Sequence, residues 1–494
     1  MLAIQKNLTN FFYTILSLPA TAVGFCLSTQ VATLSWILST EYHLHIEDVT
    51  LVWLAGPLSG LTAQPIVGII SDNNWFLGGR RKPFIAIGGI LGASMLLALP
   101  EIDFICKHTG ASVFVVAVII ALSLDMSVNV TFNPARSIIA DVTPTGEPRT
   151  KAFSWMQVVS GSFGIGAYFI SVAFGNTALI YTAAALVFIF TIIPICFIEE
   201  PKILPTTHNT TAVTTGKKSI IHSFKLVFPL YGFILFSLFT VVNKMMFNGK
   251  YDFIQTKVMF ICLGITLILG TITIKKGIKK ANNTNDFQKI ILAHSFSWLG
   301  IQSMFVMSFF YVKDKIVYML GNKQAIANSF SQIFSHTTPS KEETAGNILS
   351  LGFLLLNAVG ALLPVFVLEP LSKLYGKINT YITAISFMVI GFFILFLGGH
   401  TEWVFYLGMF TCGIGWSAVI SIVFAIMTEK VAAQNMGMYM SLFNFSIVLP
   451  AMMTTGISKL IIELNNSSYL YLIITVCLIV SIICWLFVKD PSKK

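Results

Sequence analysis

The chain has 494 residues, of which 55% are hydrophobic and only 11% are charged, whereas a soluble domain carries about 25% charged residues. So few charges cannot cover a water-soluble surface of this size, which excludes an ordinary soluble enzyme, a nucleic-acid-binding protein and a disordered scaffold. A membrane-spanning helix needs about 20 apolar residues, so the length allows a dozen or more spans. We therefore expect an all-α polytopic membrane protein that spans a lipid bilayer. Its net charge of +10 favours anchoring charges on the cytoplasmic side over binding to nucleic acid.

The first half of the chain predicts six membrane spans. The segment around Lys6 and Ala20-Thr21-Ala22 resembles a signal peptide, but the apolar run continues to about Leu38 and is long enough to span a membrane. We expect an uncleaved helix there. The six apolar runs are 13–39, 50–71, 83–100, 112–139, 152–174 and 177–197.

A polar linker from about 199 to 223 separates these runs from the second half. Two further apolar runs follow it, and then six more. They are 225–243 and 256–274, then 288–311, 346–369, 378–398, 402–428, 435–463 and 468–488. The expected organisation is an N-terminal six-helix bundle (1–198), a linker with two extra helices (199–287) and a C-terminal six-helix bundle (288–494), which makes 14 spans.

The distribution of basic residues predicts the orientation of these spans. If both termini lie in the cytoplasm, 22 of the 31 lysine and arginine residues fall on the cytoplasmic side, as the positive-inside rule requires. The chain is rich in Ile, Asn and Lys, which suggests an AT-rich bacterial genome. We therefore expect the protein to lie in a bacterial cytoplasmic (inner) membrane.

A six-plus-six arrangement resembles the two-bundle plan of the major facilitator superfamily, in which the substrate binds between the halves. The segment between the second and third runs supports this resemblance. It carries Gly68 and Asp72, and then Gly79, Arg80 and Arg81; a degenerate copy occupies 369–377 in the second half. We interpret these five residues as a gating motif.

One acid stands apart from the loops, because Asp125 lies about halfway along the run that ends at Ile139. An ionisable group at mid-membrane costs roughly 2.5–3.5 kcal/mol on insertion scales, so it is a candidate functional group. At 100° per residue, Asn129, Phe132 and Arg136 share its helix face. One hypothesis is that Asp125 takes up a proton and binds substrate; the alternative is a structural partner for an arginine or for interhelical hydrogen bonds.

Two sequence blocks resemble the sucrose/proton symporter family, within the glycoside–pentoside–hexuronide:cation symporters. The first is residues 53–68 (WLAGPLSGLTAQPIVG) with the basic motif after it, and the second is residues 124–141. Weaker similarity covers 296–298, 355–357 and 368–370. The resemblance implies that Asp125 is the protonation and sugar-binding residue and Arg136 a transport-critical cation. Gln64 belongs to the matched motif, and Asn129 completes the candidate site.

Other polar and aromatic residues inside the spans have open roles. Amide side chains bridge membrane helices as often as they bind ligands, and His294 is expected to be a packing residue. Trp155, Trp298 and Trp416 could stack on a sugar ring, although tryptophan also anchors membrane interfaces. The remaining mid-span amides are Gln30, Gln157, Gln302, Asn347, Asn357 and Asn444.

The sequence lacks nucleotide-binding, metalloprotease, hydrolase and dinucleotide motifs. We therefore expect no enzyme activity, no cofactor and no metal. The predicted function is a monomeric, proton-coupled symporter that imports a sugar, such as sucrose or maltose, by alternating access. The alternatives are a proton-driven carrier or exporter of another small polar solute, and a non-transporting membrane sensor.

Overall fold

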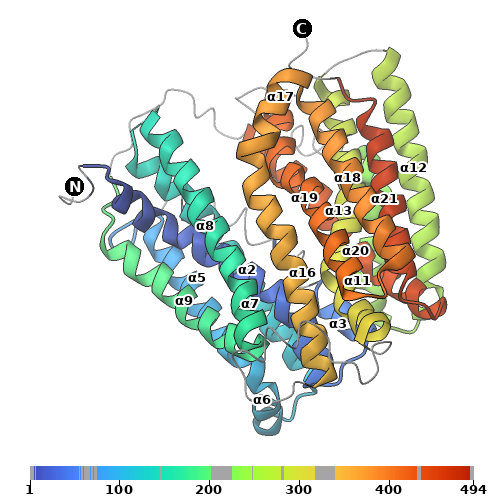
Figure 1. The fold of residues 1–494 in the computed structure, drawn as a ribbon, viewed down its shortest axis with the longest axis horizontal. Helices are drawn as coiled ribbons and strands as arrows, with labels where there is room; N and C mark the ends of the chain where they lie inside the picture. The colour runs from blue at the N-terminus through green and yellow to red at the C-terminus, as the bar shows by residue number, and fades with distance from the viewer. Residues whose placement is uncertain are drawn as a thin grey trace. The chain divides into compact units, whose positions relative to one another are not determined.

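A computed structural model describes residues 5, 7–54, 56, 59–60, 67, 70–71, 75–144, 147–201, 225–247, 249–279, 283–317, 340–430 and 436–489. Within these residues the regular secondary structure is helical, and the β-pairing is limited to an isolated bridge between Phe76 and Gly79. The prediction of an all-α protein is confirmed (Figure 1).

The first half of the chain folds into long helices that begin and end at polar or glycine signals. Thr9 caps the helix that begins at Asn10, and Ser112 caps the helix that begins at Val113. Each hydroxyl accepts a hydrogen bond from the backbone N–H three residues on. The helices are α2 (Asn10–Thr40), α3 (Ile46–Val52), α5 (Lys82–Ala98), η1 (Leu99–Glu101), α6 (Ile102–Thr109), α7 (Val113–Val142), α8 (Glu147–Phe174) and α9 (Asn176–Cys196).

The second half continues the same pattern. Two π-helical segments, η4 (Val312–Val317) and η5 (Pro364–Leu368), extend long helices. The other elements are η2 (Phe228–Leu230), α11 (Tyr231–Phe247), η3 (Asp252–Ile254), α12 (Gln255–Lys279), α13 (Asn283–Tyr311), α16 (Lys341–Leu363), α17 (Glu369–Tyr375), α18 (Lys377–Gly398), α19 (Glu402–Lys430), α20 (Met436–Glu463) and α21 (Tyr469–Trp485).

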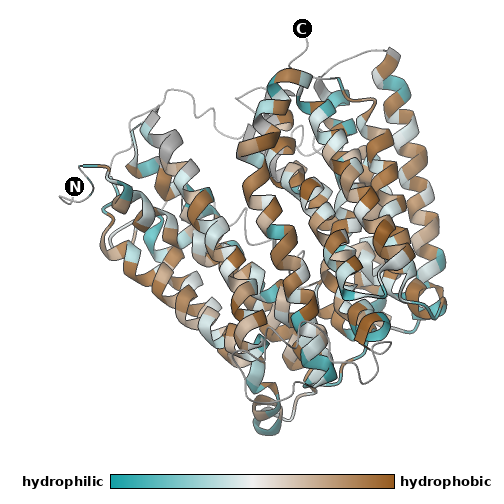
Figure 2. Ribbon diagram, in the orientation of Figure 1, coloured by the Kyte–Doolittle hydropathy of each residue, from teal (hydrophilic) through white to brown (hydrophobic). Residues whose placement is uncertain are grey.

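The helices agree with the predicted membrane spans. Among the described residues, eleven helices are long and apolar enough to cross a membrane, and 228–244 and 469–485 are shorter apolar helices. The helix observed at the predicted span 83–100 is longer than predicted, because it continues through η1 and α6 to Thr109. Half of the predicted span 50–71 lies outside the described residues. Figure 2 shows apolar residues along the helices and hydrophilic ones mainly near their ends.

The chain forms two compact units. One holds α2 to α9 and α16 up to Asn357; the other holds η2 to η4, α16 from Ala358, and η5 to α21. The extra helices α11 and α12 pack on α20 in this second unit. There Gln255 Nε2 donates to Thr455 Oγ1 (2.9 Å), and Thr256 Oγ1 donates to Glu463 Oε1 (3.0 Å).

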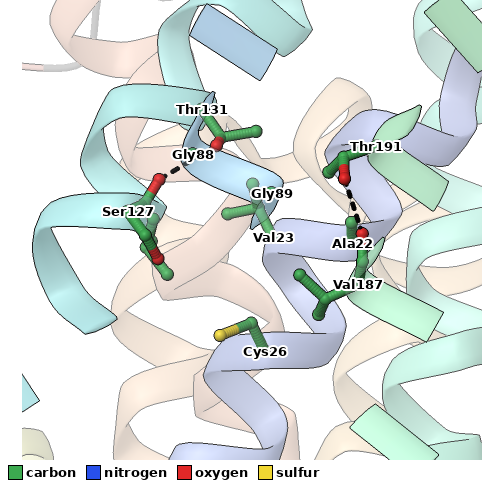
Figure 3. Close-up of a pocket in the computed structure, with 10 residues that line it drawn as sticks. Ala22, Val23, Cys26, Gly88, Gly89, Ser127, Thr131, Val187 and Thr191 are labelled. Carbon is green, nitrogen blue, oxygen red and sulfur yellow. Dashed lines mark hydrogen bonds between the residues drawn. The ribbon is translucent and has the colours of Figure 1, made fainter. Parts of the chain in front are cut away.

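Small residues bring α5 close to its neighbours in the first unit. A Cβ added at Gly88 would collide with Thr131 Oγ1 of α7, and one at Gly89 with Thr191 Oγ1 of α9. Both hydroxyls donate to the carbonyl four residues earlier on their own helices, which keeps them from being unsatisfied in the membrane (Figure 3). Close backbone approach through small residues is typical of membrane helices and fixes the position of α7.

Candidate functional site

The candidate site centres on Asp125, which lies on α7 with its side chain buried (5% exposed). Ser112 starts this helix and the apolar membrane-crossing stretch runs from Val113 to Ile139. Asp125 therefore lies near the middle of a span, as its place in the sequence predicted.

An amide is the partner of this carboxyl group. Gln30 of α2 directs Nε2 at both Asp125 oxygens, at 3.2 Å each. No ion pair involves Asp125 in the part of the chain that the structure describes. Gly56 lies on another side, where an added Cβ would come within 3.2 Å of Asp125 Oδ2. The carboxyl group thus lies between α2 and the start of the predicted second span, and no cation among the described residues balances a charge on it.

Asn129 joins α7 to that same segment. Its Nδ2 donates to Ser59 Oγ and to the Asp125 carbonyl oxygen, both at 2.8 Å, and Ser59 Oγ donates to the Gly56 carbonyl oxygen at 2.9 Å. These bonds use both amide protons of Asn129. The described geometry therefore gives Asn129 a positioning role beside Asp125, while Gln64 lies outside the described residues.

Arg136 lies three helical turns from Asp125, a rise of about 16 Å along α7. Its side chain is exposed, and the guanidinium carbon lies 4.0 Å above the ring of Phe132. This geometry is a cation–π contact. The structure brings Arg136 to Phe132, as the shared helix face predicted, but does not bring it to Asp125.

The predicted gating motif is an ion-pair network around the start of α5. Arg80 Nη2 and Arg81 Nε both contact Asp141 Oδ2, at 3.4 and 3.2 Å. Arg81 Nη1 also donates to Ser71 Oγ at 2.6 Å. Asp141 and the two arginines are mostly buried, and the single carboxylate offsets part of the two positive charges. Gly68 and Asp72 lie outside the described residues.

The motif analysis missed Glu200, which follows α9 and is buried (5% exposed). Its carboxylate accepts the backbone N–H groups of Arg80, Arg81 and Lys82 at 2.8–3.1 Å. A carboxylate there caps α5, satisfying donors that the first turn leaves free and complementing the helix dipole. Gly79 provides the space, because an added Cβ would collide with Glu200. One sequence feature could have indicated this partner. The adjacent acids Glu199 and Glu200 follow the sixth predicted span, on the same predicted side of the membrane as the basic motif.

A small cavity lies on the same side of α7 as the packed glycines. It is lined by residues of α2, α5, α7 and α9, including Cys26, Ser127 and Thr131 (Figure 3). Its volume of about 10 Å³ has room for about one water molecule. This cavity is therefore too small to bind a sugar, and it is a packing feature of the first unit.

The membrane helices and the ion-pair network fit one large class of transporters. Residues 16–364 and 329–494 match the Major Facilitator Superfamily. The chain belongs to the major facilitator superfamily. This superfamily consists of multi-pass integral membrane transporters, so the chain is a membrane transporter and not an enzyme.

Curated relatives resemble this transporter over part of their length. A general alpha-glucoside permease of Schizosaccharomyces pombe is 34% identical over 119 residues, 23% of this chain and 21% of the relative. Sucrose transport protein SUT2 of Oryza sativa subsp. indica is 38% identical over 117 residues, 21% and 23% of the two chains. Sucrose transport protein SUC4 of Arabidopsis thaliana is 33% identical over 129 residues, 23% and 25%. The match spans about a quarter or less of these relatives, and it confirms the resemblance seen in the motifs.

Solved structures share the fold over nearly the whole chain. The nucleoside transporter NupG superposes with a TM-score of 0.60 over 96% of this chain and 98% of its own, at 13% identity. The POT family transporter PepTSo superposes with a TM-score of 0.63 over 97% of this chain and 98% of its own, at 11% identity. At these identities the likeness establishes the fold alone.

Proposed function

We propose that this transporter is a proton-coupled symporter that imports a sugar, with Asp125 as its proton-binding group. The observation that carries the proposal is the buried Asp125 carboxyl group. It accepts hydrogen bonds from the Gln30 side-chain amide, and no cation among the described residues pairs with it. The sugar as substrate class is supported by the relatives named for sucrose and alpha-glucosides.

The environment of Asp125 suits reversible protonation. Desolvation penalises an ionised carboxyl group, and binding a proton removes that penalty. An amide donor also tolerates both forms, because Gln30 can rotate to donate to a carboxylate or accept from a carboxylic acid. A group that is protonated on one side of the membrane and releases the proton on the other couples proton entry to solute entry.

Arg136 and the gating motif have separate roles in this proposal. Arg136 presents a fixed positive charge near the predicted cytoplasmic end of α7, where it favours release of the proton from Asp125. Arg80 and Arg81, together with Gly68, Asp72 and Gly79, form the gate at the predicted cytoplasmic side. Asn129 holds α7 against the segment at 56–59, and Gln64 stays a candidate substrate contact.

The test is sugar accumulation in proteoliposomes that contain the full chain. One proton crossing ~100 mV provides about 2.3 kcal/mol, which is enough for roughly 50-fold accumulation of a neutral solute. We expect labelled sucrose or maltose to accumulate under a proton gradient and to lose accumulation with an uncoupler. Asp125→Asn should abolish accumulation while keeping exchange of internal for external sugar.

Asp103→Asn is the matched control, since Asp103 is an exposed acid at the start of α6. It should accumulate sugar like the wild type. Wild-type accumulation that persists in Asp125→Asn contradicts the role of Asp125. Accumulation driven by a sodium gradient alone contradicts proton coupling, and a proton-driven loss of internal sugar indicates an exporter.

A further inference from the structure

The most buried of the apolar helices in the described part of the second unit, α13, exposes one narrow stripe. Between positions 291 and 309 every residue is buried except Trp298, Gln302 and Phe305, which are partly exposed. Spacings of four and three residues place these side chains within about 60° on one helix face. We call these three residues the α13 stripe. The helix contacts α12, α19, α20 and α21.

Buried neighbours hold the first aromatic ring of the stripe in place. Trp298 Nε1 donates to His294 Nε2 at 2.8 Å, and the fully buried His294 ring stacks on Phe443 with 4.7 Å between ring centroids and 19° between planes. This hydrogen bond and stack fix the indole plane of Trp298. An aromatic surface that is ordered before binding loses little conformational entropy when a ligand arrives.

Trp416 of α19 completes an aromatic wall beside the stripe. Its ring lies edge-to-face with Trp298 (6.1 Å, 74°) and with Phe305 (5.5 Å, 87°). Gly360 of α16 lies close to the five-membered ring of Trp416, because an added Cβ would lie 2.7 Å from Cδ1 and 3.3 Å from Nε1. Trp416 is also partly exposed. Three rings therefore present partly exposed surfaces around one amide, that of Gln302.

Two polar groups of this wall have no partner in the described part of the second unit. They are the Gln302 amide and the Trp416 indole N–H. An unpaired amide beside hydrocarbon is costly, so this face fits a polar ligand better than lipid tails. The stripe and Trp416 carry no ionisable group, which favours a neutral ligand over a charged one.

We infer that the α13 stripe and Trp416 form the sugar-ring subsite of the second unit. The C–H face of a pyranose ring stacks on the indole of Trp298. The ring hydroxyls accept from Trp416 Nε1 and exchange hydrogen bonds with Gln302, which both donates and accepts. His294 is a positioning residue that orients Trp298. The inference rests on the proposed function and names residues that recognise the sugar apart from Asp125.

The experiment measures equilibrium binding of maltose and sucrose to the purified full chain in lipid nanodiscs. We expect Trp298→Ala and Gln302→Leu each to raise Kd by about 10-fold, equivalent to about 1.4 kcal/mol, and Trp298→Phe to raise it less. Trp403→Ala is the matched control, since Trp403 is 64% exposed at the start of α19 and should leave Kd unchanged. Melting temperatures identify any variant that fails to fold.

The two proposals fail in different measurements. If the wild type binds sugar and both Trp298→Ala and Gln302→Leu, folded as judged by melting, keep the wild-type Kd, the subsite is wrong and the proposed function stands. If the wild type binds neither sugar, both proposals are wrong. If the wild type binds sugar but the Asp125→Asn variant still accumulates it, only the coupling role of Asp125 is wrong. The subsite is supported if Kd rises in the stripe variants and the Kd of Trp403→Ala equals that of the wild type.

Discussion

The carboxylate of Glu200 is predicted to hold the start of α5, and Glu200→Gln tests this directly. The carboxylate accepts three backbone N–H groups, and glutamine keeps only one acceptor oxygen while it turns an NH₂ group toward those donors. A buried N–H left without an acceptor costs about 1–3 kcal/mol, and losing a negative charge at a helix N-terminus costs roughly 0.3–1 kcal/mol. The free energy of unfolding should therefore fall by about 1–4 kcal/mol.

The assay is the melting temperature of the purified chain in detergent, with Glu199→Gln as the control. For a cooperative unit of 150–250 residues, 1 kcal/mol shifts Tm by about 2–4 °C, so Glu200→Gln should melt roughly 3–16 °C lower than the wild type. Glu199 is exposed, and its substitution removes the same charge at the adjacent position, where a surface change has little effect on stability. Equal melting temperatures for the two variants would refute the capping role of Glu200.

Two glycine substitutions test close contacts elsewhere in the first unit. Gly56→Ala places a methyl group 3.2 Å from Asp125 Oδ2, so sugar accumulation should fall several-fold with little change in Tm; normal accumulation would show that the carboxyl group moves freely. Gly89→Ala drives a methyl group into Thr191, and overpacking of this kind costs about 1–3 kcal/mol, which thermal melting should reveal. Gly166→Ala, with no atom within 4 Å of the added Cβ, should melt like the wild type.

Helix positions could be predicted because the membrane imposes them. Apolar runs of the length of a bilayer must be helical, since hydrocarbon offers no partner to backbone N–H and C=O groups. The predicted runs 112–139 and 177–197 accordingly agree with α7 and α9. The ends were less predictable: helix continues from α5 through α6 to Thr109, because a polar end can stay helical beyond the apolar run.

The candidate site was predictable as residues but not as contacts. Asp125 is identifiable because a mid-span acid is costly, and the basic motif because its residues are adjacent in sequence. Gln30 is 95 residues from Asp125, and Glu200 is about 120 residues from the N–H groups that it accepts. The sequence gives no distance between residues so far apart, so these partners were not predicted.

The scarcity of charge in the sequence determined by itself that this is a polytopic helical membrane protein, and it indicated which acid is out of place in a span. That conclusion needs only local information, namely composition, the length of apolar runs and helical periodicity. The tertiary structure alone decided that an amide and not an arginine holds Asp125, that Glu200 caps α5, and that Trp298 rests on His294. These contacts depend on how helices pack, and packing follows from close-approach positions such as Gly88 and Gly89, whose partners on other helices the sequence does not specify.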